Sequence, residues 1–388
     1  MLQDVYIVGM NRIPFGKYRG FYKDENAVDL GVLALKGLLK KNIVSQDKID
    51  NILIGNVLSA GLGQNVARQI ALKSGLPESI VATSIDDVCG SSLKALRFAQ
   101  GQMLLGDYEI AVVGGAESMT NAPLLLNKSK KHDKNPVYQD SLMIDGIGDA
   151  YSEKPMGITA ENVADKYQVT RQDMDEFARD SHAKAYAAQE NNWFEEEYAP
   201  IKLNGKVLDH DETIRPDTSL DALGQLKPVF KANGRVTAGN SSPLTDGASM
   251  VLLANQQKLD ELDLTPLAYL GAYAEIGCDP AYMGYAPYFA IKKLLKETNS
   301  TIDDYDLVEI NEAFAAQAYA VARDLNIPKE KLNIAGGAIS LGHPLGATGT
   351  RLVISAVNSL RKINGRRAIV SLCIGGGQGI AYEIGRIF

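Results

Sequence analysis

The sequence contains few of the residues that form disulfides or bind metals. Its 388 residues include three cysteines, four histidines and one tryptophan. Three cysteines cannot form a disulfide framework, and their spacing, at Cys89, Cys278 and Cys373, excludes a zinc ribbon. Because thiols are so scarce, each cysteine is a candidate for chemistry.

Long apolar runs and an excess of positive charge are also missing. The apolar stretches 110–113 and 368–374 fall far short of the roughly 20 residues that a membrane helix needs. The 40 basic and 47 acidic residues give a net charge of −7, which argues against a nucleic-acid or anionic-membrane partner. No signal peptide, peroxisomal tripeptide or prenylation motif is visible. We therefore expect a cytoplasmic enzyme.

The apolar pattern predicts an α/β fold. Short apolar runs typical of strands buried on both faces occur at 5–8, 52–54, 110–113, 307–310 and 368–374. Apolar residues at helical spacing lie between them, at 28–39, 93–104, 315–325 and 352–360. Strands that alternate with helices indicate a mostly parallel sheet covered by helices.

The two ends of the chain resemble each other, and the middle differs from both. Asn56 precedes Cys89 at nearly the same separation as Asn311 precedes His343, and each half then has an apolar run that ends in glycines. We interpret this as a duplication, although α/β proteins show such recurrences without one. The region 118–244 differs from both ends in composition, and we interpret it as a large insertion over the core.

Cys89 is the first candidate nucleophile. Apolar residues at helical spacing follow it, which predicts a position near a helix N-terminus, where free amides and the helix dipole favour thiolate over thiol. The flanking Gly90 and Ser91 leave room for a substrate carbonyl. A buried structural cysteine is the alternative interpretation.

Three further positions could contribute to the same chemistry. His343, between Gly342 and Pro344, is held rigidly and can present one ring nitrogen as a donor or base, unless it is a solvated loop histidine. Cys373 ends an apolar run before three glycines, whose free amides suit an oxyanion hole or a phosphate cradle. NAD binding is not expected, because a dinucleotide motif opens a βαβ unit and here the chain ends about ten residues later. Asn311 follows a buried strand together with Glu312, at the sheet edge where ligands of α/β proteins bind, or Asn311 is a helix N-cap.

Five motifs occur in the order and spacing of the thiolases, and the resemblance covers essentially the whole chain. They are 88–91, 114–119, 311–314, 342–346 and 373–377. Among thiolases the chain is most similar to the acetyl-CoA acetyltransferases. The resemblance implies the thiolase fold: two duplicated αβαβα halves, at 1–117 plus 245–265 and at 266–388, with a loop domain at 118–244.

The resemblance also implies a role for each motif residue. Cys89 would take the acyl group as a thioester, and His343 would activate it. Cys373 would be the acid and base at the α-carbon of the second acetyl-CoA. Asn311 would hold a catalytic water, and the amides of Cys89 and Gly375 would form an oxyanion hole.

Substrate contacts follow in the same way. The expected CoA-binding residues are Arg215, Ala238 and Ser242, and the expected acyl-pocket residues are Met156, Met283, Ala313 and Phe314. Acetyl-CoA, acetoacetyl-CoA and CoA are the implied substrates, without a metal or other cofactor. A homodimer or homotetramer with contacts in 118–150, and a place in the mevalonate pathway, are implied as well.

Some residues depart from the family pattern. Pro155 replaces a frequent histidine beside the pocket, Ser92 replaces a glycine and Pro243 replaces a small residue. These departures concern acyl chain length, and a degradative 3-ketoacyl-CoA thiolase is the alternative. A ketoacyl synthase or cysteine hydrolase has no need for Cys373, and a non-catalytic acyl-CoA-binding relative is expected to lose one of Cys89, His343 and Cys373.

Overall fold

A single hydrogen-bonded sheet of ten strands forms the centre of the molecule. The computed structural model describes residues 5–41, 44–131 and 133–387; residues 1–4 and 388, at the outer bounds of the predicted halves, lie outside the described residues, as do 42–43 and 132. The strand order is β14 (Leu307–Ile310), β15 (Arg367–Ile374), β16 (Gln378–Gly385), β13 (Ala268–Gly277), β1 (Val5–Arg12), β12 (Thr245–Asn255), β5 (Ile110–Glu117), β3 (Asn51–Gly55) and β4 (Val81–Ile85), and β2 (Gly16–Lys17) pairs with β12.

The strand pairing repeats itself in the two halves of the chain, which confirms the predicted duplication. β3 is parallel to β5, β5 is antiparallel to β12, and β12 is antiparallel to β1. In the same sequence of pairings, β14 is parallel to β15, β15 is antiparallel to β16, and β16 is antiparallel to β13. A parallel bridge from Val308 to Leu332 stands where β4 pairs with β3. The two halves join where β1 pairs with β13.

The prediction of a mostly parallel sheet is wrong, because most neighbouring strands are antiparallel. The tight turn Gly375–Gly377 joins β15 to β16, and a connection this short can only join antiparallel strands. Burial on both faces produced the continuous apolar runs, and here helices bury parallel and antiparallel strands alike.

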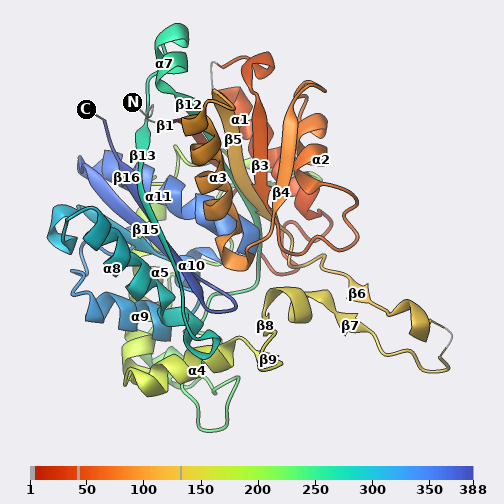
Figure 1. The fold of residues 1–388 in the computed structure, drawn as a ribbon. Helices are drawn as coiled ribbons and strands as arrows, with labels where there is room; N and C mark the ends of the chain where they lie inside the picture. Colours follow the sequence, from red (N-terminus) through yellow and green to blue (C-terminus); the bar gives the residue numbers. More distant parts are fainter. Residues whose placement is uncertain (1–4, 42–43, 132, 388) are drawn as a thin grey trace.

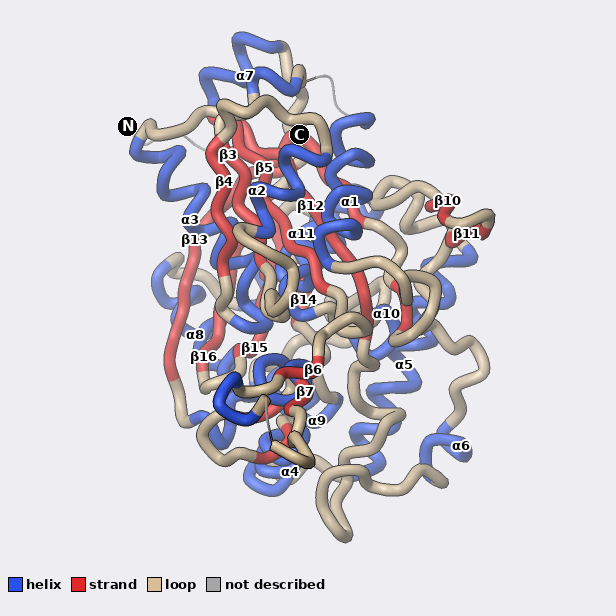
Figure 2. The backbone as a smooth tube through the Cα atoms, turned by 90° about the vertical axis from the view of Figure 1, so that its right-hand side faces the viewer, coloured by secondary structure: helices blue, strands red, loops and turns tan. Residues whose placement is uncertain are grey.

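Helices cover the sheet in layers (Figures 1 and 2). α1 (Ala27–Lys41) and α2 (Val66–Lys73) pack on the outer face of the N-terminal strands, with Leu35 and Ile70 in one cluster with Val112. α3 (Ser91–Leu105) and α11 (Thr348–Ile363) form a central layer in contact with both halves. α8 (Ala286–Glu297) and α9 (Ala315–Asp324) cover the outer face of the C-terminal strands. The order is therefore helix, sheet, helix, sheet, helix.

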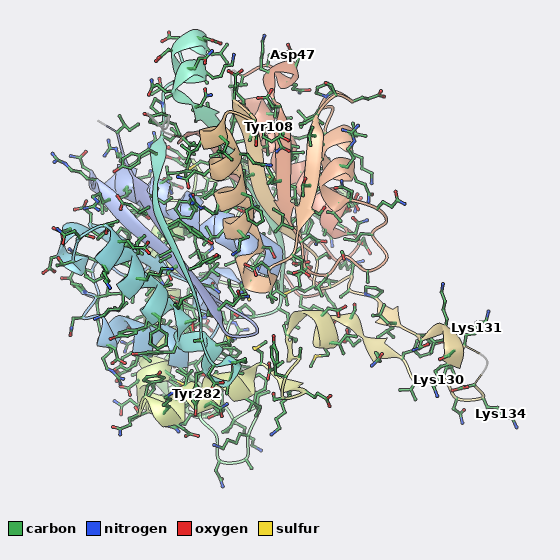
Figure 3. The ribbon with its side chains drawn as sticks, viewed as in Figure 1. Asp47, Tyr108, Lys130, Lys131, Lys134 and Tyr282 are labelled. Carbon is green, nitrogen blue, oxygen red and sulfur yellow. The ribbon has the colours of Figure 1, made fainter. Side chains whose placement is uncertain are left out.

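The region between β5 and β12 wraps around the lower end of this core in Figure 1. Its elements are β6 (Leu124–Leu125), β7 (Gln139–Asp140), β8 (Gly148–Asp149), β9 (Lys154–Pro155), α4 (Gly157–Lys166), α5 (Arg171–Glu190), β10 (Ile201–Leu203), β11 (Lys206–Leu208) and α6 (Leu220–Gly224). Thr170 and Asp173 form a capping box at the start of α5. β6 and β7 form an arm that projects from the body, with Lys130, Lys131 and Lys134 at its tip (Figure 3).

The remaining helices are α7 (Gln256–Leu262), which follows β12, and α10 (Ala338–Leu341), which precedes α11. Among the described residues, no helix combines the length and the apolar character needed to cross a membrane.

Candidate active site

Three segments from distant parts of the chain meet at one point. Cys89 lies in the turn that leads into α3, His343 in the loop between α10 and α11, and Asn311 directly after β14. His343 Nε2 lies 3.3 Å from Cys89 Sγ and 3.3 Å from Asn311 Nδ2. All three are buried, at 8%, 5% and 0% exposure. The solvated-loop interpretation of His343 is therefore wrong.

The turn that carries Cys89 is strained and fixed in place. Val88 has φ = 47°, a left-handed conformation that a β-branched residue rarely adopts. The Ser91 hydroxyl donates to the Val88 carbonyl at 2.6 Å and accepts from the Asp87 amide at 2.9 Å, so one side chain closes the turn from both ends. Strain of this kind, held by its surroundings, is common at reactive residues.

The loop that carries His343 is equally fixed, as its glycine and proline neighbours predict. Gly342 has φ = 97°, and a side chain there would collide with Thr245. The Thr245 hydroxyl accepts from the His343 amide at 3.3 Å, and Thr348 Oγ1 lies 2.6 Å from His343 Nδ1. Burial, with a smaller effect from the Arg351 cation, lowers the pKa of His343 to about 3, so this imidazole is neutral.

Burial reverses the expected protonation of Cys89. The residue does lie at the start of α3, but removal from water raises the pKa of its thiol to about 12. Hydrogen bonds from the Gly375 amide and from its own amide act in the opposite direction and are weaker. The expectation that the helix terminus favours thiolate is therefore wrong in the free protein, and Cys89 needs a base. His343 Nε2 is in position to be that base.

Cys373 lies at the end of β15 and is fully buried. Burial and the neighbouring Cys89 both raise the pKa of its thiol. The side chain belongs to a small apolar cluster with Met156, Met283, Ala313 and Phe314. All of the predicted acyl-pocket residues therefore surround the second thiol.

An apolar pocket opens directly above the Cys89–His343 pair. Gly375, Ser242 and the predicted acyl-pocket residues line it, as do Val88, Met119 and Leu345 from the motifs 88–91, 114–119 and 342–346. Other lining residues were not indicated by the sequence: Met143, Gly146, Ile147, Gly157, Phe230, Ser241 and Leu244. Pro155 and Pro243, two departures from the family pattern, also line the pocket. Met119 belongs to the motif 114–119, but no local signal in the inserted region marks Met143, Ile147 or Phe230.

Two of the predicted CoA contacts lie in a separate cavity. Arg215 and Ala238 line it together with His182. Ser241 and Pro243 line both this cavity and the apolar pocket, so the two adjoin. The amide and hydroxyl of Ser242 donate to the Ala313 carbonyl at 3.0 and 3.1 Å, which fixes the loop between the two spaces.

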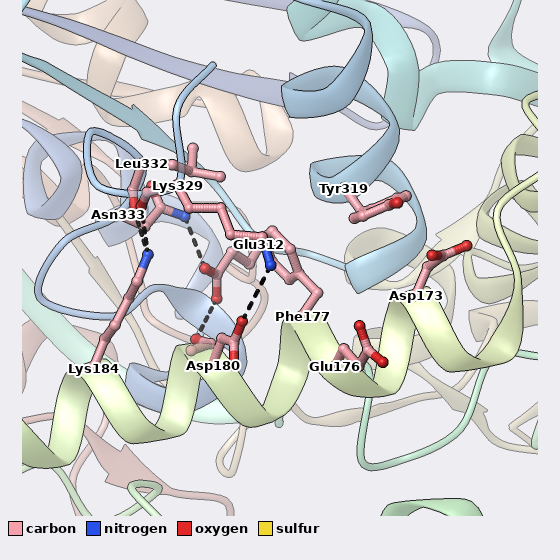
Figure 4. Close-up of a pocket in the computed structure, with 11 residues that line it drawn as sticks. Asp173, Glu176, Phe177, Asp180, Lys184, Glu312, Tyr319, Lys329, Leu332 and Asn333 are labelled. Atoms are coloured by element: carbon pink, nitrogen blue, oxygen red, sulfur yellow. Dashed lines mark hydrogen bonds and ion pairs between the residues drawn. The ribbon is translucent and has the colours of Figure 1, made fainter. Parts of the chain in front are cut away.

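The two polar side chains of the motif 311–314 lie in different places: Asn311 contacts His343, and Glu312 does not. Glu312, expected at the ligand edge with Asn311, lines a cavity beside α5 together with Lys184 and Asn333 (Figure 4). Its carboxylate accepts from Ser181, from Asn333 and from the Ile339 amide. That expectation is wrong for Glu312, because these buried donors hold its side chain there.

Asn311 is not a helix N-cap either. α9 begins at Ala315 and its N-cap is Phe314. The Oδ1 atom of Asn311 is buried without a hydrogen-bond partner, and Nδ2 faces His343. A buried amide oxygen without a hydrogen-bond partner destabilises the fold, and such groups concentrate at functional sites.

The third cysteine lies outside this constellation. Cys278 is half-buried beyond β13, and its amide donates to the Gly377 carbonyl at 2.6 Å. Among the residues that the structure describes, no group of three or more His, Cys, Asp or Glu side chains could hold a metal ion.

Comparisons with known proteins agree with this geometry. The family model of the thiolase N-terminal domain matches residues 5–257, and that of the thiolase C-terminal domain matches residues 264–386. A probable acetyl-CoA acetyltransferase of Escherichia coli is 43% identical over 99% of this chain and 100% of its own. A probable acetyl-CoA acyltransferase of Staphylococcus epidermidis is 42% identical over 97% of both chains.

Solved structures show the same fold. Human mitochondrial 3-ketoacyl-CoA thiolase in complex with CoA superposes with a TM-score of 0.96 at 39% identity, over 100% of this chain and 99% of its own. The Bacillus anthracis acetyl-CoA acetyltransferase gives a TM-score of 0.96 at 35% identity, with the same coverage. On sequence, fold and the arrangement of its motifs, this chain belongs to the thiolase family.

Proposed function

We propose that this acyltransferase is an acetyl-CoA C-acetyltransferase, which condenses two acetyl-CoA molecules reversibly to acetoacetyl-CoA and CoA through an acetyl-Cys89 intermediate. The observation that carries the proposal is the 3.3 Å contact between Cys89 Sγ and His343 Nε2 beneath an apolar pocket that Gly375 also lines. This arrangement suits a thioester substrate, because it supplies a nucleophile, its base and a nearby backbone amide together.

In the first half-reaction, His343 Nε2 takes the proton of Cys89, and the thiolate attacks the acetyl carbonyl of acetyl-CoA. The carbon–sulfur bond to CoA then breaks, and Cys373 gives its proton to the departing CoA thiolate. The raised pKa of Cys373 means that it enters this step as a thiol, ready to act as the acid.

In the second half-reaction, the Cys373 thiolate removes an α-proton from a second acetyl-CoA. Protonated His343 and a water held by Asn311 stabilise the enolate oxygen, and the carbanion attacks the acetyl group on Cys89. Cys89 leaves as a thiolate and regains its proton from His343. Cys373 enters this step as the thiolate because it gave its proton to CoA in the first half-reaction, and acetylation of Cys89 removes one of the smaller causes of its raised pKa.

The size of the acyl group follows from the cluster around Cys373. Met156, Met283 and Phe314 pack together there, and Met283 is only 2% exposed. These side chains fill the space that a longer acyl tail needs, which favours acetyl. We propose that CoA extends past Ser242 toward Arg215 and Ala238, and that no metal or further cofactor takes part.

A 3-ketoacyl-CoA thiolase for longer chains is the second candidate. Met143, Ile147 and Pro155 extend the apolar lining of the pocket beyond the cluster around Cys373. An apolar wall of this kind could accommodate additional methylene groups.

Intact-protein mass spectrometry after mixing with acetyl-CoA tests the acetyl-Cys89 intermediate. The wild-type protein should gain one acetyl group, and Cys89→Ala should gain none. An adduct that persists in Cys89→Ala overturns the assignment. Loss of acetoacetyl-CoA absorbance on addition of CoA tests the overall reaction.

A further inference from the structure

Thr348 is the first residue of α11, and its hydroxyl contacts the ring of His343 from the side opposite Cys89. Its side chain is fully buried. Thr348 Oγ1 lies 2.6 Å from His343 Nδ1 and 3.0 Å from the carbonyl oxygen of Pro344. The hydroxyl therefore has two polar partners and a single proton with which to serve them.

The chemistry of these partners decides where the proton of Thr348 lies. A carbonyl oxygen such as that of Pro344 can only accept a hydrogen bond, so the hydroxyl donates to it. The lone pair of Thr348 Oγ1 then faces Nδ1 of His343, which must donate. A neutral imidazole carries one proton, and the hydrogen bond at one nitrogen decides which nitrogen holds it.

We propose that Thr348 is a positioning residue that holds His343 in the Nδ1–H tautomer, so that the lone pair of Nε2 is available to take the proton of Cys89. The inference rests on the proposed function and deepens it, because it states how the base is prepared. The Nδ2 group of Asn311, 3.3 Å from Nε2, is a donor and agrees with a bare Nε2.

The same hydrogen bonds serve both protonation states of His343. When Nε2 takes the proton from Cys89 Sγ, the imidazolium still donates from Nδ1 to Thr348, and Thr348 still donates to Pro344. No other proton moves and no side chain reorients. Such a prepared arrangement lowers the cost of reorganisation during the reaction.

The charged and titratable groups around the pair affect the charged forms of His343 and Cys89 rather than the choice of tautomer. Arg351 on α11 disfavours the imidazolium, while Asp87 and Glu117 disfavour the thiolate of Cys89. Cys373 faces Cys89 from β15. None of them is hydrogen-bonded to Nδ1, which Thr348 contacts.

The test compares Thr348→Val, which keeps the shape and removes the hydroxyl, with Thr348→Ser, which keeps the hydroxyl. Alkylation of Cys89 by iodoacetamide, located by peptide mass spectrometry, reports the availability of the base without any CoA substrate. At neutral pH we expect Thr348→Val to slow alkylation about tenfold to hundredfold, and Thr348→Ser to restore most of the rate. Equal rates in wild type and Thr348→Val overturn the proposal, as does a Thr348→Ser variant as slow as Thr348→Val.

A second measurement needs no variant of Thr348. Long-range ¹H–¹⁵N correlation spectra of protein labelled with ¹⁵N-histidine distinguish the two neutral tautomers, and His343→Gln assigns the resonances. We expect the Nδ1–H form, and an Nε2–H form in the wild-type protein overturns the proposal. Both readouts are independent of acetoacetyl-CoA chemistry, so failure of the proposed function and failure of this inference are distinguishable.

Discussion

The carboxylate of Glu117 accepts a hydrogen bond of 2.8 Å from the amide of Gly346, although the two residues belong to opposite halves of the chain. The same carboxylate accepts from the amides of Val57 and Leu58 and from the side chain of Asn56. Gly346 lies in the loop of His343, so Glu117 holds that loop against the end of β3. One buried carboxylate thus braces the two halves beside the active site.

Substituting Glu117→Gln should weaken both the fold and the reaction. An amide nitrogen at this position faces backbone donors, and the resulting loss of hydrogen bonds should lower the free energy of unfolding by about 1–3 kcal/mol. Because the His343 loop loses its brace, kcat for thiolysis of acetoacetyl-CoA should fall as well. Urea denaturation and steady-state kinetics measure the two effects.

Glu212→Gln is the matched control. Glu212 also accepts from two backbone amides, those of Lys17 and Phe21, but is not hydrogen-bonded to the His343 loop. The Glu212→Gln variant should lose stability and keep the wild-type kcat. A Glu117→Gln variant with wild-type kcat contradicts the bracing role.

Removing either of the two buried thiols, Cys89 or Cys373, should affect the two half-reactions differently. Cys373→Ala keeps the Cys89–His343 pair and should still be acetylated by acetyl-CoA, more slowly because the departing CoA thiolate lacks its proton donor. It should not form acetoacetyl-CoA, because the α-proton has no acceptor. Mass spectrometry measures the first step and acetoacetyl-CoA absorbance the second. Normal condensation by Cys373→Ala would refute the assignment, and Cys89→Ala, inactive in both steps, is the comparison.

Acyl chain length should depend on Met156. In the wild type, kcat/KM for the four-carbon 3-ketoacyl-CoA should exceed that for the six-carbon substrate by about tenfold to hundredfold, because a misfitting group in a closed pocket is costly. Met156→Ala opens the pocket and should reduce that ratio. Met250→Ala, on β12 in the cluster beneath α1 and α2, is the control and should leave the ratio unchanged. Equal values for four, six and eight carbons would instead place the protein with the degradative thiolases.

Much of the fold could be predicted from local pattern. The apolar run 307–310 is β14 residue for residue, and the helix predicted at 28–39 lies within α1. Strand direction could not be predicted, because burial on both faces produces the same apolar run in parallel and antiparallel strands. Helical spacing also misplaces part of the buried face of α1: Val28 and Leu35 are buried, but Val32 is only partly buried.

In the candidate site, too, local geometry could be predicted from the sequence, and effects of the whole fold could not. Cys89, His343 and Asn311 lie in motifs whose glycines and prolines fix local geometry, and they meet as expected. The protonation of Cys89 depends on burial by the whole fold, which no motif of a few residues encodes. The direction of the Glu312 side chain likewise depends on donors from α5 and from α10.

Below neutral pH, the free energy of unfolding should decrease as the pH falls, in part because of His182. Burial, followed by the charge of Arg215, lowers the pKa of this imidazole from 6.5 to about 4. Between these values the unfolded chain binds a proton that the folded protein does not, so the free energy of unfolding decreases as pH falls through this window. The slope from one such group is at most about 1.4 kcal/mol per pH unit. Buried His343 adds to the slope with the same sign.

Replacing His182 should flatten this dependence. His182→Gln removes one titrating group. The slope of the free energy of unfolding against pH, measured by urea denaturation from pH 7 to pH 4, should therefore decrease by up to about 1.4 kcal/mol per pH unit. Thr213→Val is the control: Thr213 lines the same cavity and donates to the Ser340 carbonyl at 2.7 Å, so its removal should lower stability equally at every pH. A His182→Gln slope equal to that of the wild type would show that this histidine is already protonated in the folded protein, which contradicts its acceptance of a hydrogen bond from the Arg215 amide at 3.2 Å.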